Sequence, residues 1–316
     1  MGGASSRGNY GRNNLSLSVY PLDTNVSLVF RSIEFLLLRS RVTVYCYNII
    51  LQIVNKIAII GGGNLGTSLS EGLITSGKYS VDDIIISKRN PETLPHLLKK
   101  GFNIISDNKS AIQQSEIVVL AVLPQQFDAV ISEIKGSLTA SHVLVSVVSG
   151  VTIAAIESMV SNTPVLRAMP NTAIAIRESM TCIASNEKSK PHEKRISQVF
   201  DCVGLSMTIH EELMSSATAL CACGVAFFLR AIRAASQGGT QVGFHADESL
   251  KMAAQTAKGA SALLIEHGKH PEREIDKVTS PEGCTIAGLN EMEHKGFSSA
   301  MIRGIVTSAG KAGKLY

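Results

Sequence analysis

The sequence predicts an α/β fold in which a doubly wound parallel sheet is followed by an all-helical domain. Between residues 56 and 209, short apolar runs rich in β-branched residues alternate with helical patterns. Runs without polar alternation are typical of strands buried on both faces of a parallel sheet. After residue 210 long patterns of helical periodicity take over. We therefore expect a sheet domain over residues 56–209 and a helical domain over residues 210–316.

The predicted elements follow from these runs and from the turn residues between them. Strands are expected at 56–60, 83–87, 102–105, 117–122, 143–148 and 165–169. Helices of the sheet domain are expected at 65–76, 91–100 and 127–134. In the helical domain we expect long helices at 211–237 and 246–267 and shorter ones at about 285–295 and 297–313.

Residues 1–55 differ in composition from the rest. They hold five arginines, two acids and no lysine, and so carry +3 of the chain's net charge of +4. We interpret them as an extension outside the functional fold, either poorly ordered or translated from upstream of the true start. An organelle transit peptide is the alternative, but the apolar content is high for one.

Composition also bears on partners and compartment. The nearly neutral remainder carries no basic face, which argues against nucleic acid. No apolar run of the first 55 residues reaches the ~20 residues of a membrane span, and we expect no membrane partner. The six cysteines lack metal-ligand spacing, so we expect no metal site, reduced thiols and a cytoplasmic protein.

A glycine-rich turn follows the first predicted strand. Gly61, Gly63 and Gly66 satisfy G-x-G-x-x-G between that strand and a predicted helix. The first glycine allows the tight turn, the second lets the backbone approach a pyrophosphate, and the third permits close packing of helix on strand. The helix N-terminus, with Asn64 and Leu65, supplies N–H groups to the anion. A Rossmann-like dinucleotide site explains this setting better than a plain turn.

The end of the second predicted strand bears on the choice of dinucleotide. An NAD site usually carries an acid there for the ribose 2′-hydroxyl, whereas this chain has Ser87, Lys88 and Arg89. A hydroxyl and a guanidinium suit a 2′-phosphate, which a carboxylate would repel. Ordinary solvated charges are the alternative interpretation of Lys88 and Arg89. We expect NADPH as the cofactor, with NADH possible.

Four further segments carry recognisable motifs: AVLPQ at 121–125, SGVTI at 149–153, RAMPNT at 167–172 and VTSPEGCT at 278–285, followed by IAG. With the glycine turn they resemble the Δ1-pyrroline-5-carboxylate reductase family over about residues 56–310. The resemblance implies NADPH-dependent reduction of the cyclic imine 1-pyrroline-5-carboxylate to L-proline, the last step of proline biosynthesis.

The resemblance also implies an assembly and further site residues. The C-terminal helices pair as a homodimer, often assembled further into decamers, and the active site lies between one subunit's cofactor domain and the paired helical domains. Asn108 matches a position on the adenosine side of the cofactor. We expect Met169 near the nicotinamide, as a further substrate-binding residue, although a buried methionine is more often core filler. The other implied cofactor residues are Ala121, Val122, Pro124 and Asn171.

The segment at 280–285 is the predicted substrate site, with Ser280, Gly283, Cys284 and Thr285 as its residues. Because it opens a short helix, its N–H groups can converge on the substrate carboxylate. Thr285 can donate its hydroxyl to the ring nitrogen, which makes it the predicted catalytic residue. A helix N-cap is the alternative role for Thr285, and the two roles can coexist.

Three departures from the family pattern stand beside these matches. Leu123 replaces a usual lysine, and Glu282 replaces a usual glycine beside the proposed carboxylate site. The helix that normally reads SGSGPAY is CACGVAF at 221–227. These changes indicate a divergent branch of the same enzyme or an altered substrate preference.

Two rival functions remain open. A β-hydroxyacid dehydrogenase shares the general plan, but such enzymes typically need a lysine on the first long C-terminal helix, and residues 211–230 contain none. A non-catalytic NADPH-binding protein would explain the departures. It would not explain why the segment at 280–285 is retained, since cofactor binding does not require it.

Overall fold

The structure of the chain is a computed structural model that describes residues 56–160 and 162–314. The interpretation of residues 1–55 lies outside the described residues. The described residues belong to one compact unit, so the division at 209/210 into two domains stays a prediction.

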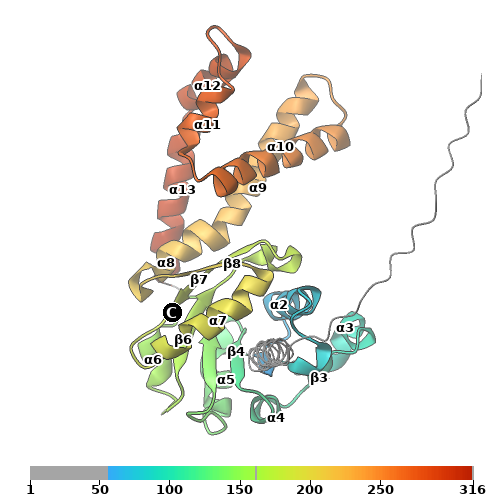
Figure 1. The fold of residues 1–316 in the computed structure, drawn as a ribbon, viewed down its shortest axis with the longest axis vertical. Helices are drawn as coiled ribbons and strands as arrows, with labels where there is room; N and C mark the ends of the chain where they lie inside the picture. The colour runs from blue at the N-terminus through green and yellow to red at the C-terminus, as the bar shows by residue number, and fades with distance from the viewer. Residues whose placement is uncertain (1–55, 161, 315–316) are drawn as a thin grey trace, which may run out of the picture. The chain divides into compact units, whose positions relative to one another are not determined.

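Eight strands of the described chain form one sheet, in the order β3-β2-β1-β4-β5-β6-β7-β8 (Figure 1). The first six are parallel, and their order is that of a doubly wound dinucleotide-binding sheet. The predicted fold class is therefore confirmed. The strands are β1 Ile57–Ile60, β2 Ile84–Ser87, β3 Asn103–Ile105, β4 Ile117–Leu120, β5 Val143–Ser146, β6 Val165–Met169, β7 Ser179–Ala184 and β8 Gly204–Thr208.

The strands β7 and β8 were not among the predicted elements. β7 runs antiparallel to β6, and β8 is parallel to β7, so the sheet departs from the all-parallel expectation at this edge. β8 exposes Leu205 and Met207, as expected of an edge strand. Polar residues interrupt both strands, which therefore lack the continuous apolar runs that identified the other six.

Helices cover both faces of the sheet (Figure 1). β1 shows why, because Ile57 and Ile59 pack into one core while Ala58 and Ile60 pack into the other, all fully buried. Helices α2 (Asn64–Thr75), α3 (Pro95–Lys99) and α7 (Glu193–Phe200) contribute to the first core. The second core is completed by α4 (Asn108–Gln113), α5 (Phe127–Ile134) and α6 (Ile153–Glu157).

The prediction of one helix over 91–100 is wrong. A 3-10 turn at Pro91–Thr93 is separated from α3 by Leu94, whose backbone is not helical (φ −118°, ψ 53°). Leu94 precedes Pro95, and a proline ring disfavours the helical conformation of the residue before it.

The C-terminal part is helical, as predicted. One helical stretch runs from Glu211 to Gln241 and contains α8 (Met214–Ala217), a π-helical turn (Thr218–Cys223) and α9 (Gly224–Gln241). It passes Gly238 and Gly239, where the sequence prediction ended it. A Cβ at Gly239 would overlap the hydroxyl of Ser249, so this glycine permits close contact between α9 and the next helix. The remaining helices are α10 Ala246–His267, α11 Pro271–Lys277, α12 Cys284–His294 and α13 Phe297–Ala312.

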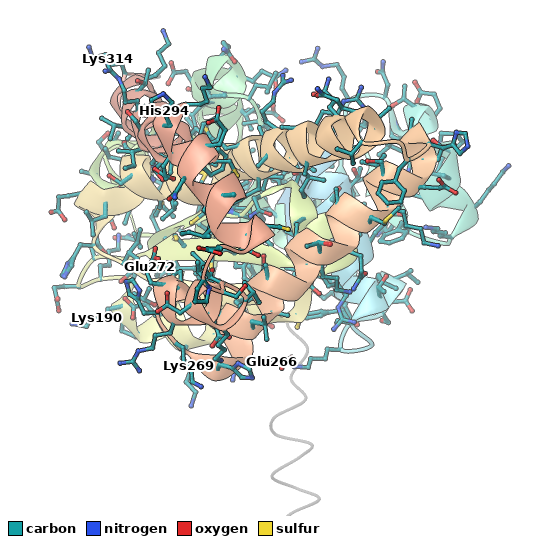
Figure 2. The ribbon with its side chains drawn as sticks, turned by 90° about the horizontal axis from the view of Figure 1, so that it is seen from above. Lys190, Glu266, Lys269, Glu272, His294 and Lys314 are labelled. Atoms are coloured by element: carbon teal, nitrogen blue, oxygen red, sulfur yellow. The ribbon has the colours of Figure 1, made fainter. Side chains whose placement is uncertain are left out.

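The C-terminal helices carry both charged and apolar exposed side chains. Figure 2 shows Glu266, Lys269 and Glu272 projecting outward near the connection between α10 and α11. Large apolar side chains are also exposed, among them Phe228, Leu229, Ile265, Ile302 and Val306. By length and composition the stretch Glu211–Gln241 is apolar enough to cross a membrane, and 28% of its most apolar window is buried. A single such helix is weak grounds for a membrane span.

Candidate active site

The glycine turn connects β1 to α2, as the sequence predicts. Gly61 has a positive φ of 115°, and a Cβ there would overlap the carbonyl of Ala121 in the loop after β4. A Cβ at Gly66 would overlap the carbonyl of Gly61, so this glycine serves packing. No atom lies within 4 Å of a Cβ built at Gly63, the N-cap of α2. The turn therefore leaves open space beside a helix N-terminus, where a pyrophosphate fits.

A cleft of about 1140 Å³ lies over this turn, at the carboxyl ends of the parallel strands. In doubly wound sheets this edge, where the strand order reverses, is the ligand-binding edge. The cleft brings together every predicted cofactor residue except Gly66 and Asn171, namely Gly61, Gly63, Asn64, Leu65, Ser87, Lys88, Arg89, Asn108, Ala121, Val122 and Pro124.

Ser87 and Asn108 form a polar pair at one end of the cleft. The buried Ser87 hydroxyl donates a hydrogen bond of 2.5 Å to Oδ1 of Asn108. The backbone carbonyl of Ser87 accepts from the N–H groups of Gly61 and Gly62, both at 3.0 Å. These hydrogen bonds fix the end of β2 against the glycine turn, and so they fix the backbone position from which Lys88 and Arg89 extend.

Those residues, Lys88 and Arg89, are the cations predicted to bind the 2′-phosphate. Both line the cleft, and Arg89 is exposed. Neither forms an ion pair within the described part of the chain. The Lys88 stem passes close to Gly62, at 3.0 Å from a Cβ built there. Two unneutralised cations beside a phosphate-binding turn fit NADPH.

Glu133 on α5 also lines the cleft and was missed by the sequence prediction. Its Oε1 accepts a hydrogen bond of 3.0 Å from Nδ2 of Asn108, which fixes the orientation of that amide. Ala129 and Val130 line the cleft from the same helix, whereas its core side carries Phe127, Ile131 and Ile134. Helical periodicity separates the two faces, and this is the signal that could have found Glu133.

The two residues predicted at the nicotinamide end lie outside this cleft lining. Met169 is buried at the end of β6 with Ala184 and Met214. Asn171 is also buried; its Oδ1 accepts from the N–H of Ala173, and its Nδ2 donates to the carbonyl of Cys221 at 3.1 Å. Within this chain Asn171 therefore links the end of β6 to the π-helical turn. A direct contact of either residue with the nicotinamide stays a prediction.

The other predicted substrate residues, Ser280, Gly283, Cys284 and Thr285, lie together at the start of α12, away from Met169 at the end of β6. The N-cap of α12 is Gly283, whose N–H donates to the carbonyl of Ser280. Thr285 is the second residue of the helix, so its alternative role as N-cap is wrong. Cys284 and Thr285 are exposed, and no residue of 280–285 lines the cofactor cleft of the same chain. The structure of a single chain does not bring the two predicted sites together.

An ion pair between a buried arginine and a partly exposed glutamate lies at the start of the long C-terminal helical stretch. Arg167 of β6 is 6% exposed, and its guanidinium donates to Glu211 Oε1 at 3.1 Å. The same oxygen accepts from the N–H of Ile153 at 2.7 Å. Glu211 therefore links β6, the segment at 149–153 and the first C-terminal helical stretch. Sequence reasoning did not single out this pair, whose members are far apart in the chain.

Two family models match the chain. Residues 56–150 match the model described as NADP oxidoreductase, coenzyme F420-dependent. Residues 211–315 match the model described as pyrroline-5-carboxylate reductase dimerisation. The first covers the glycine turn and the cleft, and the second covers the exposed apolar helices.

Similar proteins include two from Dictyostelium discoideum. Pyrroline-5-carboxylate reductase 1 is 49% identical over 275 residues, 83% of this chain and 50% of that protein. The chain thus spans half the length of this relative. Pyrroline-5-carboxylate reductase 2 is 47% identical over 276 residues, 82% of this chain and 92% of that protein.

A solved structure agrees with these relatives. The crystal structure of Plasmodium falciparum pyrroline carboxylate reductase with NADP bound is 25% identical to this chain, with a TM-score of 0.73 over 83% of this chain and 98% of that one. The doubly wound sheet, the cofactor cleft and these similarities lead to one assignment: the chain belongs to the pyrroline-5-carboxylate reductase family.

Proposed function

We propose that this protein reduces 1-pyrroline-5-carboxylate to L-proline with NADPH, the last step of proline biosynthesis. The observation that carries the proposal is the cleft at the switch point of the sheet. It combines an open glycine turn with two unneutralised cations, Lys88 and Arg89, in a chain of this family. When bound there, NADPH supplies the hydride.

The residues of this chain bind different parts of the cofactor. Gly61, Gly63 and the N-terminus of α2 accommodate the pyrophosphate. The 2′-phosphate is held by Lys88 and Arg89, and the adenosine side contacts Asn108. The loop after β4, with Ala121, Val122 and Pro124, lines the same cleft.

The substrate is held at the start of α12. This helix has eleven residues, and its first N–H groups, free of helical partners, suit the substrate carboxylate. The exposed Thr285 hydroxyl donates to the ring nitrogen as the hydride reaches the adjacent carbon. Positioning the imine carbon against the cofactor supplies much of the acceleration, since it replaces a bimolecular encounter.

The complete site requires a second copy of the chain. The segment at 280–285 lies outside the cofactor cleft of its own chain, and α9, α10 and α13 expose apolar side chains such as Phe228 and Ile302. Pairing of these helices as a homodimer buries that surface and leaves an active site between cofactor and helical domains.

We further propose assembly of dimers into a decamer, with no membrane or nucleic-acid partner, and a location in the cytoplasm. Light scattering and cell fractionation test these proposals.

The decisive experiment is a steady-state assay of NADPH oxidation with 1-pyrroline-5-carboxylate, repeated with NADH and with a panel of β-hydroxyacids. We expect turnover with the imine and a preference for NADPH. Turnover with a hydroxyacid alone would favour the dehydrogenase alternative. NADPH binding without turnover of any cyclic imine would favour a non-catalytic protein.

The variant Thr285→Ala tests the catalytic role within that assay. We expect kcat to fall about a hundredfold, as loss of a proton donor does, while the Kd for NADPH is unchanged. Thr208→Ala, which removes an exposed hydroxyl from β8, is the control and keeps full turnover. Unchanged turnover of Thr285→Ala would rule out its role.

A further inference from the structure

Two thiols face each other where β7 meets the π-helical turn. The Sγ atoms of Cys182 and Cys221 lie 3.9 Å apart and share an S–H···S hydrogen bond. Cys182 is 4% exposed, whereas Cys221 is partly exposed. Cys221 is the first residue of the CACGVAF segment, which replaces the family's usual SGSGPAY.

The pair lies among the residues predicted at the nicotinamide end of the site. Cys182 is the register partner of Met169 across the antiparallel pairing of β6 and β7. The backbone carbonyl of Cys221 accepts the hydrogen bond from Nδ2 of Asn171. A change in the distance between the two sulfurs would therefore act on both residues.

A metal site does not explain the pair. Zinc sites use three or four protein ligands, and within the described residues no group of three or more His, Cys, Asp or Glu side chains is arranged to hold an ion. A dithiol of this kind instead suits oxidation, because one sulfur can attack the other once that sulfur carries a leaving group.

The two thiols are also unequal in reactivity. The hydrogen bond from the Cys182 S–H lowers the pKa of Cys221 to about 7, although partial burial opposes this shift. The thiolate is the nucleophilic form of cysteine. Cys221, the more exposed sulfur, is thus the one that reacts first.

We propose that Cys182 and Cys221 form a peroxide-sensitive dithiol that closes to a disulfide and thereby slows hydride transfer. The effect on hydride transfer rests on the proposed function, whereas formation of the disulfide does not. The co-reactant is hydrogen peroxide or an organic hydroperoxide.

The chemistry balances in two steps. The Cys221 thiolate attacks one peroxide oxygen, the O–O bond breaks, and the departing hydroxide takes up a proton and leaves as water. The sulfur of Cys182 then attacks the sulfur of the Cys221 sulfenic acid; an S–S bond forms, the S–O bond breaks, and a second water leaves with the Cys182 proton. Two thiols lose two electrons and two protons, and one hydrogen peroxide becomes two waters.

Closure must move the π-helical turn or its side chains. The sulfurs have to approach from 3.9 Å to the disulfide length of about 2.0 Å. π-helical turns are departures from regular helix that occur often at functional sites, and this one carries the carbonyl to which Asn171 donates. The disulfide would therefore displace the acceptor that orients Asn171, and small displacements at a reacting site are costly.

The test treats the full chain with hydrogen peroxide, blocks remaining thiols and identifies crosslinked peptides by mass spectrometry. We expect a Cys182–Cys221 crosslink with loss of two hydrogens, reversed by dithiothreitol. In parallel, NADPH-dependent turnover of the imine falls on the order of tenfold and recovers after reduction. The crosslink is absent from Cys182→Ser and, should that buried substitution impair folding, from Cys221→Ser. Cys223→Ser, on the same helical stretch and also partly exposed, is the matched control and still crosslinks.

The outcomes are distinguishable. Absence of the crosslink, or oxidation of Cys221 only to sulfinic acid, would overturn the proposal. A crosslink without loss of turnover would overturn the regulatory part. If the reduced protein lacks imine turnover altogether, the proposed function fails, while the crosslink still reports on the dithiol.

Discussion

The Ser87 hydroxyl donates a 2.5 Å hydrogen bond to Oδ1 of Asn108, and Nδ2 of the same amide donates to Glu133. These two hydrogen bonds fix the orientation of the Asn108 amide, which lines the cleft at the predicted adenosine end. β2 ends in Ser87, so it lacks the acid that binds the ribose hydroxyl in a usual NAD site. We therefore expect the next two residues, Lys88 and Arg89, to discriminate between NADPH and NADH.

Arg89→Gln tests that discrimination. Loss of one charge-assisted contact to the 2′-phosphate costs about 2 kcal/mol, so we expect the KM for NADPH to rise at least tenfold. The KM for NADH, which lacks that phosphate, changes little. Steady-state kinetics with both cofactors measure the effect. Lys99→Gln, an exposed lysine outside the cleft on α3, is the control, and an equal loss with NADH would contradict the assignment.

Gly63→Ala and Gly66→Ala separate cofactor binding from packing. At Gly63 the methyl group meets no atom within 4 Å and φ is −84°, so we expect unchanged stability. It occupies the space for the pyrophosphate, and NADPH affinity falls tenfold or more. At Gly66 the methyl overlaps the Gly61 carbonyl, which costs about 1–3 kcal/mol of folding free energy. Thermal unfolding measures the stability of both variants, and titration with NADPH measures their affinity. Loss of stability in Gly63→Ala would contradict the assignment of Gly63 to cofactor binding and Gly66 to packing.

The sequence predicted most accurately the elements that depend on residues close together in the chain. The strand–turn–helix unit from β1 to α2 is local, since each residue's role follows from those beside it, and its structure agrees with the prediction. β8 was missed because an edge strand buries little and its apolar side chains stay exposed, as at Leu205 and Met207. The hydrogen bond from Asn108 to Glu133 was also missed. The two residues lie on α4 and α5, which are separated in the chain by β4, so no local pattern predicts their contact.

The substrate end shows a second limit. The motif identified Ser280–Thr285, but neither periodicity nor spacing in the sequence predicts which part of the structure this segment lies against. In the single chain no residue of this segment lines the cofactor cleft, and the proposed pairing of two chains would bring the two sites together. The Arg167–Glu211 ion pair escaped prediction for a related reason, as the two residues lie 44 positions apart.

Glu282→Gly removes a strained residue beside the proposed carboxylate site. Glu282 has a φ of 57°, a left-handed conformation that costs a residue with a Cβ roughly 1 kcal/mol. Glycine adopts this conformation without strain, which stabilises the folded state. Its greater freedom in the unfolded chain offsets part of this gain, so we expect the free energy of unfolding to rise by about half a kcal/mol. Denaturant unfolding at fixed protein concentration measures it. The control Glu291→Gly, inside α12, loses about 1 kcal/mol; equal losses would show that the backbone of Glu282 is not strained.

Glu211→Ala tests the ion pair between the sheet and the first C-terminal helix. It leaves the Arg167 guanidinium, 6% exposed, without its carboxylate and the Ile153 N–H without its acceptor. Since Glu211 is partly exposed, we expect a loss of about 2 kcal/mol, below the range for fully buried pairs. Glu116→Ala breaks the more exposed pair with Arg195 and loses less than about 1 kcal/mol. Urea unfolding compares them, and equal losses would contradict a special role for Glu211.

The pH dependence of Cys221 alkylation tests the hydrogen bond on which the dithiol depends. Below the pKa of Cys221, about 7, the thiol is protonated and reacts slowly; above it the thiolate predominates, so the rate rises with pH through about 7 and then levels off. Cys182→Ala removes the S–H that stabilises this thiolate. The midpoint then moves up, toward the ordinary value of 9.0. Rates with iodoacetamide, followed on the Cys221 peptide by mass spectrometry, give the midpoint.

Cys223→Ser is the matched control for that measurement, because it removes a nearby thiol and leaves the S–H···S bond of Cys182 and Cys221 in place. We expect its midpoint to equal that of the wild type. The same midpoint in Cys182→Ala would show that Cys182 does not stabilise the thiolate. A downward shift would mean that the hydrogen bond runs in the opposite direction, with Cys221 donating to Cys182, and the order of attack in the dithiol would then be reversed.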